Sequence, residues 1–93
     1  MPEKYDPGRL QAAAAMLPGW AAGEDVIAKT FTFSDHIAAV GFVVRVAMAA
    51  EVADHHPDLR IVYNRVEIRL NSHDAGGVTD RDVALAAKIN ELA

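Results

Sequence analysis

The sequence contains no cysteine and no cluster of basic residues. The first absence excludes disulfide bonds, thiolate metal ligands and thiol nucleophiles, so any chemistry must come from oxygen and nitrogen side chains. The second absence removes the electrostatic term that drives binding to a phosphate backbone, since the lysines and arginines are scattered and the formal net charge is -4. No nucleic acid partner is therefore expected.

No segment that targets or anchors the chain is expected. Residues 1–5 do not begin a basic segment followed by an apolar run, which marks a secretory signal. The most apolar stretch, residues 37–50, is interrupted by Arg45 and is shorter than the ~20 residues that span a bilayer. These features favour a cytoplasmic protein without a membrane partner, in which the apolar stretch forms a buried helix.

The composition is that of one small globular domain. The chain has 93 residues, of which 52% are hydrophobic and 24% are charged. Two separate cores of half this length would bury too little apolar surface to offset the entropy of ordering them. Residues 1–93 are therefore expected to form a single domain with one core.

The first part of the sequence predicts a helix and a hairpin. Residues 9–17 are rich in alanine and are stopped by Pro18-Gly19, a pattern that predicts a helix. Residues 20–21 and 26–33 flank a turn that contains glycine, and the second stretch alternates between apolar and other residues. This alternation indicates a β-hairpin with one apolar face.

A second helix is predicted from Ser34, as its N-cap, to about Asp54, because His55-His56-Pro57 must end it. A helix that is apolar on both faces needs cover on both. In so small a domain we expect a second subunit as the cover, and hence a homo-oligomer (dimer or tetramer) through residues 34–54. One face carries Phe42, Val43, Val46 and Ala50, and the opposite face carries Val40, Val44 and Met48.

The second half of the sequence predicts two further strands and a last helix. Residues 59–72 alternate with a period of two, and Tyr63-Asn64 is the expected break between strands. Thr79 is the predicted N-cap of the last helix, with Asp82 at the capping-box position. The prediction is an α+β fold of order α-β-β-α-β-β-α, in which three helices pack on one face of a four-stranded antiparallel sheet.

Three histidines lie at the ends of predicted elements, where functional sites are often built. His55 and His56 follow a helix, and His73 lies where a strand gives way to a loop. Glu51 and His55 are four residues apart and are expected to share a helix face, while Pro57 turns His56 elsewhere. The two adjacent imidazoles can therefore serve different roles.

Two other interpretations of these histidines stay open on this pattern alone. The His-His-Pro sequence can be a capping arrangement, in which the helix dipole favours imidazolium. Three histidines can also bind zinc, although neither an i,i+4 histidine pair nor a Glu-x-x-His sequence is present to organise such a site. Neither a metal nor a cofactor is expected.

A resemblance to a known family favours the catalytic interpretation. The residues that carry it are Glu51, His55-His56-Pro57, Tyr63, His73 and Asp82. In type and spacing they resemble the motif of the pterin-4a-carbinolamine dehydratase family. The resemblance covers nearly the whole chain and extends to Gly19-Trp20 and to residues 31–33, 41–42, 45–47 and 77–82. Two residues outside the motif depart from it, namely Leu59, where relatives usually carry an aromatic, and Ala75, where some carry cysteine.

The resemblance implies a cofactor-free dehydratase that converts a 4a-hydroxytetrahydropterin to a quinonoid dihydropterin in tetrahydrobiopterin recycling. The 4a hydroxyl must gain a proton and N5 must lose one, and imidazole suits both roles near neutral pH. By resemblance, His55 and His73 are the acid and base pair, His56 holds the substrate and shares in proton transfer, and Asp82 orients His73. The further substrate contacts that the resemblance implies are Glu51, Asp54, Pro57, Asn71, Ser72 and Asp74.

Some of these assignments have a plain structural alternative. Trp20 could stack on the flat pterin, but a lone tryptophan in a small domain is more often part of the core. Glu51 can equally be a solvated carboxylate at a helix end. Asp82 can cap its helix, and this role can coexist with a role in the site.

A binding module is the alternative from a different functional class. Some animal relatives look like two-function proteins that also stabilise dimers of a homeodomain transcription factor through the same long helix. Residues 34–54 are apolar enough for such a partner, although a second copy of the chain explains them equally well. A third interpretation is a family member with low pterin activity that serves another metabolic role.

Overall fold

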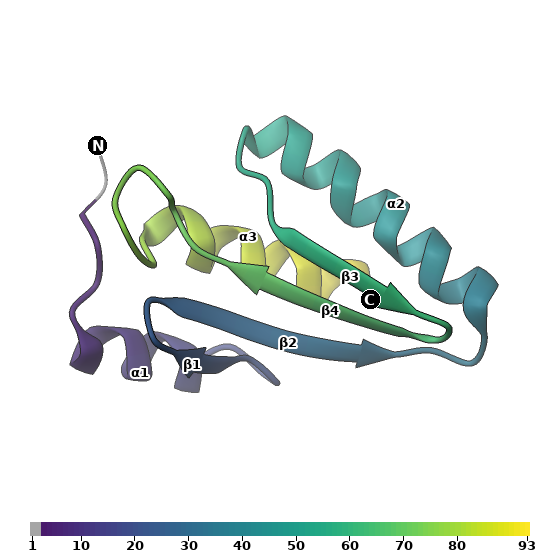
Figure 1. Ribbon diagram of the computed structural model, residues 1–93, viewed down its shortest axis with the longest axis horizontal. Coiled ribbons are helices and arrows are strands. Elements are labelled where there is room, and N and C mark those ends of the chain that lie inside the picture. Colours follow the sequence, from purple (N-terminus) through teal and green to yellow (C-terminus); the bar gives the residue numbers. More distant parts are fainter. Residues whose placement is uncertain (1–2) are drawn as a thin grey trace.

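A computed structural model describes residues 3–93, in which four antiparallel strands form one sheet in the order β1-β2-β4-β3. Three helices accompany this sheet, and the predicted α+β fold of order α-β-β-α-β-β-α is confirmed (Figure 1). The elements are α1 (Pro7–Ala15), β1 (Ala21–Gly23), β2 (Val26–Thr32), α2 (His36–Ala53), β3 (Asp58–Val62), β4 (Arg65–Leu70) and α3 (Asp80–Leu92).

The helices cover one face of the sheet, and the period of two along each strand decides which residues that face buries. Alternate residues such as Val66 and Ile68 of β4 point towards the helices, while Arg65 and Glu67 point to the opposite, open face. In Figure 1 the open face is turned towards the reader, with α3 behind it and α2 along the side of β3. The largest side chains that are fully buried are Phe42, Ile27, Ile68, Leu70 and Ile89.

The helix ends follow their capping residues and differ slightly from the predicted ones. α1 begins at Pro7, two residues earlier than predicted. α2 is capped by Asp35 rather than by Ser34, because the Asp35 carboxylate accepts a hydrogen bond of 2.8 Å from an amide of the first turn. α3 has the predicted capping box of Thr79 and Asp82. The cap residues thus set each entry into a helix.

α2 buries one face and exposes the other. Ala39, Phe42, Val46 and Ala50 pack on the core. The opposite side forms an apolar stripe, the α2 stripe, whose exposure ranges from 41% to 90% in the single chain. It consists of Ile37, Val40, Val44, Met48 and Val52. The expectation of a buried helix thus holds for one face only. By length and composition α2 could also cross a membrane, a test that helices packed on a core pass as well.

The loop between β4 and α3 is held by backbone hydrogen bonds. Ser72 and Gly77 form an isolated antiparallel bridge, in which the Ser72 amide donates to the Gly77 carbonyl at 2.8 Å. Gly76 adopts a φ of +76°, which side chains other than hydrogen rarely permit. Alternation continues from β4 into this loop, so Ser72 is buried and His73 is exposed.

Candidate active site

His55 is the buried member of the three histidines. α2 ends at Ala53, and the left-handed conformation of its C-cap residue Asp54 (φ 50°) turns the next residue inward. His55 is only 8% exposed, and its Nε2 lies 2.5 Å from Oδ1 of Asp82 on α3. This pair joins the end of α2 to the beginning of α3 and fixes the imidazole ring.

Asp82 is the centre of a buried hydrogen-bond network. Its second carboxylate oxygen accepts from the Ser72 hydroxyl at 2.8 Å and from the Thr79 amide at 2.9 Å. With the contact to His55, the carboxylate has three polar partners and is fully buried. Asp82 therefore orients His55, not His73 as predicted. The reason is that Ser72, and not His73, is the residue of the loop that points inward.

His56 is exposed and pairs with Glu51, because its Nε2 lies 2.8 Å from the carboxylate Oε1. The expectation that Glu51 shares a face with His55 is wrong. Helical spacing stops at the left-handed residue Asp54, so neither histidine keeps the direction that a continued helix would give it. The prediction that His55 and His56 point different ways is confirmed by their different partners.

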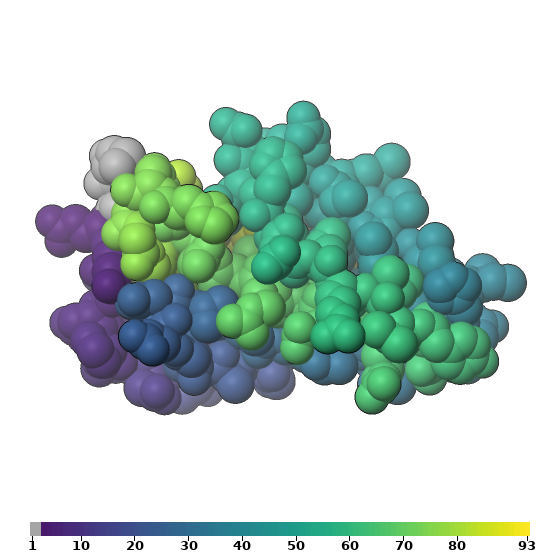
Figure 2. Space-filling model, in the orientation of Figure 1, coloured from purple at the N-terminus to yellow at the C-terminus, as the bar shows by residue number. Residues whose placement is uncertain are grey.

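His56 and His73 line a common cleft of about 370 Å³ at one end of the open sheet face. The cleft lies between the segment that follows α2 and the loop that follows β4, seen in Figure 2 in teal and light green. The predicted site residues Pro57 and Asn71 also line it. Among residues 3–93 the His73 side chain has no hydrogen-bond partner, so both its ring nitrogens can meet a bound molecule.

Four residues of the cleft are absent from the predicted site: Glu24, Val26, Asp58 and Arg69. The period of two places Arg69 on the same strand face as Asn71, and this signal could have found it. Asp58 is the register partner of Arg69 across β3 and β4. The other two residues, Glu24 and Val26, belong to the hairpin of β1 and β2. The pairing of strands brings them to the cleft, and no short pattern in the sequence specifies that pairing.

The remaining predicted contacts lie at the border of the cleft or away from it. Asp54 is the exposed C-cap of α2. Asp74 accepts a hydrogen bond of 2.6 Å from Nη2 of Arg81, and this bond holds the pKa of Asp74 below its usual value. Trp20 belongs to the core, where its Nε1 donates to the Asn90 side chain at the far end of α3 from the histidines. The structure thus does not bring Trp20 to the cleft.

A second hollow reaches His55 from the other side. It lies between α2 and α3, measures about 460 Å³, and is lined mostly by small and apolar side chains. Ala49, Val52 and Leu85 are among them, and His55 and Arg81 add polar groups. In the single chain the three imidazoles therefore gather at one end of the molecule, but His55 opens to this groove while His56 and His73 open to the cleft.

The chemistry that this arrangement supports directly is proton transfer. It offers three imidazoles, two of them paired with carboxylates, and imidazole can donate and accept protons near neutral pH. Within residues 3–93, no three histidine, aspartate or glutamate side chains gather as a metal site would require. A small molecule in the cleft would lie between His56 on one side and His73 on the other.

Comparison with known proteins identifies the family. The sequence model of the family described as "Pterin 4 alpha carbinolamine dehydratase" matches residues 3–92. The chain belongs to this family. A relative from Afipia carboxidovorans, named "putative pterin-4-alpha-carbinolamine dehydratase", is 54% identical over 85 residues, which cover 89% of this chain and 85% of that protein. A relative of the same name from Nitrobacter winogradskyi is 48% identical over 95 residues, covering 100% and 94% of the two chains.

Solved structures of the pterin dehydratase family share this fold. A transcriptional coactivator/pterin dehydratase from Brucella melitensis superposes with a TM-score of 0.91 at 35% identity, covering 98% of this chain and 99% of that one. A pterin dehydratase-like protein described as a RuBisCO assembly factor in the alpha-carboxysome has a TM-score of 0.70 at 23% identity and covers 81% of this chain. The second likeness shows the fold alone.

Proposed function

We propose that the chain dehydrates 4a-hydroxytetrahydropterin to quinonoid dihydropterin by general acid and base catalysis. The observation that carries the proposal is that His56 and His73 share a cleft beside the buried pair of His55 and Asp82. Family membership supports the class of substrate and the type of reaction. Work in pterin recycling and a cytoplasmic location stay predictions.

The reaction needs two proton transfers and no change of oxidation state. An acid protonates the 4a hydroxyl, the C4a–O bond breaks, and water leaves. A base removes the proton from N5, and the electron pair of that N–H bond becomes the second bond between N5 and C4a. One group ends without its proton and the other with an extra one, so the two must exchange protons with each other or with solvent before the next turnover.

We assign the two transfers to His55 and His73, in either order. In the single chain His55 lines the groove between α2 and α3 and not the cleft, so its proton would reach a substrate in the cleft by way of the neighbouring His56 or of water. The His73 ring can meet the substrate with either nitrogen. Asp82 holds Nε2 of His55, which fixes the ring and leaves Nδ1 for proton exchange, much as a buried aspartate positions the histidine of a catalytic triad. His56 is tied to Glu51 at the mouth of the cleft, a position that suits binding of the substrate and a secondary share in proton transfer.

The proposal is tested by supplying freshly formed 4a-hydroxytetrahydropterin to protein stripped of metal in the presence of a chelator. We expect dehydration above the uncatalysed rate, and no gain on adding zinc. Activity that returned only with zinc would favour the three-histidine zinc site instead. A lack of activity under both conditions would contradict the dehydratase and leave a binding module as the better account.

The α2 stripe is the specific observation that favours a binding role beside catalysis. It leaves five large apolar side chains exposed on one helix face, which is more than single scattered apolar residues on a normal surface. A relative of the same fold is described as a transcriptional coactivator as well as a pterin dehydratase. We propose that the stripe is covered first by a second copy of the chain, which gives a homo-oligomer through residues 34–54.

A charge on the α2 stripe should therefore dissociate the oligomer. Wild-type protein is expected to sediment as a dimer or tetramer at micromolar concentration, and Val44→Glu to sediment as a monomer, because an interface would bury the new carboxylate without a partner. Met16→Glu is the matched control, since Met16 is an apolar side chain that is 82% exposed at the C-cap of α1. A monomeric wild type, or a Val44→Glu variant that stays assembled, would contradict the proposed interface.

A further inference from the structure

Three arginines on the open sheet face stand apart from the other cations of the chain. The sequence has nine lysines and arginines, and six of them have a partner within the protein. These are Lys4 with Asp25, Arg9 with Asp80, Lys29 with Asn90, Arg45 with Leu92, Arg81 with Asp74 and Lys88 with Glu91. Among residues 3–93, Arg60, Arg65 and Arg69 have neither a hydrogen bond nor an ion pair. All three lie on one face of β3 and β4.

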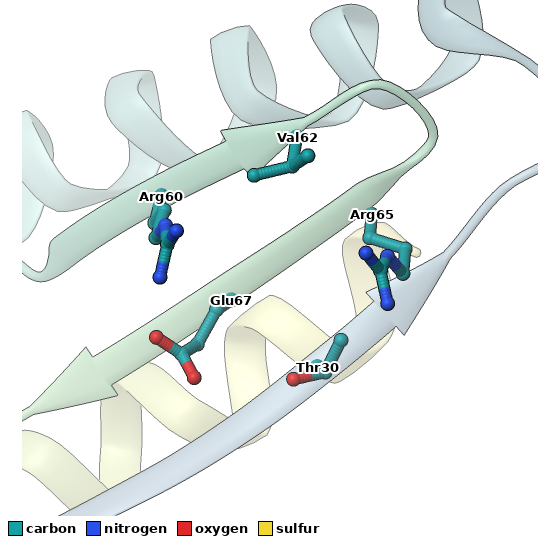
Figure 3. A pocket seen from close by; sticks show the side chains of 5 residues that line it. All are labelled: Thr30, Arg60, Val62, Arg65 and Glu67. Carbon is teal, nitrogen blue, oxygen red and sulfur yellow. The ribbon is translucent and has the colours of Figure 1, made fainter.

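Two of these arginines surround a hollow of about 250 Å³ on that face. Figure 3 shows Arg60 and Arg65 pointing into it, with Glu67 and Thr30 also on its border. Arg60 is the register partner of Glu67, and Glu67 is the partner of Thr30 on β2. Opposite residues have Cβ atoms only about 5 Å apart, so an ion pair between Arg60 and Glu67 is within reach, yet none forms.

The hollow continues the catalytic cleft along the same face. Arg69 of β4 lines the cleft. Glu67 lies two residues before Arg69 on the same strand face, and Arg65 lies two residues before Glu67. Each such step advances about 7 Å along the strand. A molecule whose ring occupies the cleft can extend a substituent along this face, first past Arg69 and then between Arg60 and Arg65. The cleft and the hollow share no lining residue but occupy adjacent rows of one sheet face, and together we call them the arginine trough.

We propose that the arginine trough binds a substituent of the pterin that ends in an oxyanion, a phosphate ester or a carboxylate. The proposal rests on the proposed function and adds the class of substrate. Guanidinium groups bind such oxyanions through paired hydrogen bonds. Glu67 and Thr30 lie between the cleft and the far arginine, where they can accept hydrogen bonds from hydroxyl groups along the substituent. Arg60 and Arg65 would hold its anionic end.

The charge balance of the hollow supports an anionic rather than a neutral ligand at its end of the trough. The hollow has two arginines, Arg60 and Arg65, against one carboxylate, Glu67, whereas the cleft adds Arg69 against Glu24 and Asp58. Placing like charges on adjacent rows of a sheet costs free energy unless something neutralises them. The other lysines and arginines each have a hydrogen-bond or ion-pair partner within the protein. That the arginines of the trough have none among residues 3–93 therefore points to a ligand.

The test compares three ligands that share a dihydropterin ring. One carries a neutral trihydroxypropyl substituent at C6, the second carries the same substituent as a terminal phosphate ester, and the third ends in a carboxylate. At low salt we expect at least one anionic ligand to bind about tenfold or more tightly than the neutral one, and this preference to shrink as salt is added. Binding is measured by calorimetry on the full chain.

The arginine variants locate the effect. Arg60→Gln and Arg65→Gln are each expected to lower the preference for the anionic ligand about threefold or more, since each removes a charge-assisted hydrogen bond. Lys88→Gln removes one positive charge from α3, on the helix side of the sheet, and should leave the preference unchanged. Circular dichroism checks that each variant is folded.

Several results would overturn the proposal. Equal affinity for all three ligands would do so, as would a preference that survives both arginine variants. Inorganic phosphate that binds alone, without any tighter binding of the phosphate ester, would show a free anion site instead. Arginine variants that change only the sedimentation of the protein would assign the trough to a second copy. Equal affinities with normal turnover contradict the trough alone, whereas binding without turnover contradicts the proposed dehydratase alone.

Discussion

His55→Ala and His73→Ala are each expected to lower turnover of 4a-hydroxytetrahydropterin about 10²-fold or more, the usual size of one general acid or base contribution. The two side chains come from different elements, the end of α2 and the loop after β4, and the fold brings them to one end of the molecule. Turnover is measured with freshly formed substrate, and thermal unfolding checks that both variants fold. His36→Ala is the matched control, because His36 is exposed and bonded only to a backbone carbonyl.

The double variant tests whether the two histidines act as a unit. Losses from residues that act together fail to add, because once one proton transfer is lost the other group has less to assist. The double variant should therefore be little worse than the poorer single variant. If His56→Ala lost as much as His73→Ala while His55→Ala kept its turnover, the working pair would be His56 and His73, and His55 would serve only to hold the site together.

Asp82→Ala is expected to have the largest effect on stability. The change leaves His55, the Ser72 hydroxyl and the Thr79 amide without their common acceptor inside the protein. Removing one partner of a buried pair typically costs roughly 3–5 kcal/mol of unfolding free energy, a large share of the stability of a small domain. Chemical denaturation measures the loss. Glu91→Gln, an exposed change on the same helix, should cost under about 0.5 kcal/mol.

Asp82→Asn separates the structural role of Asp82 from its role in the reaction. The amide oxygen can still accept from the Thr79 amide, so the helix cap and the fold should survive, but the charged acceptor for His55 is lost. We expect kcat to fall while KM changes little, because His55 is placed for proton transfer rather than for binding. A folded Asp82→Asn variant with wild-type kcat would show that the pair of Asp82 and His55 is structural only.

The fold could be predicted because local signals in this sequence agree with one another. Residues 65–70 alternate strictly, so one face of β4 had to be apolar. Thr79 and Asp82 have the spacing of a capping box, and that box forms. α2 ends at Ala53, within one residue of the end expected from His55-His56-Pro57, and the left-handed Asp54 forms its cap.

The hydrogen-bond partners of the histidines could not be predicted, because they depend on the torsion angles of single backbone residues. Helical spacing would place Glu51 beside His55, four residues later. The left-handed Asp54 ends this spacing, and Glu51 contacts His56 instead. Likewise, the choice of His55 over His73 as partner of Asp82 depends on which loop residue points inward. The sequence could place the histidines at one end of the molecule but not assign their partners.

The alternation of residues along β4 could have indicated the arginine trough, but it did not predict this site. Alternation places Arg65, Arg69 and Asn71 on one strand face, which alone is typical of an ordinary solvated surface. Only the structure shows that Arg60 of the neighbouring strand joins them and that the cleft begins on the same face. Strand register carries that information, and register is set by pairing across the sheet.

The most direct test of the account is the rate at which 4a-hydroxytetrahydropterin disappears, followed by stopped-flow absorbance with wild-type protein and with the double variant His55→Ala/His73→Ala. The account predicts that wild-type protein accelerates dehydration in proportion to its concentration. It also predicts that the folded double variant accelerates dehydration at least about 10²-fold less than wild-type protein does. No acceleration by wild-type protein, or equal acceleration by the double variant, would contradict the claim that these histidines dehydrate a pterin.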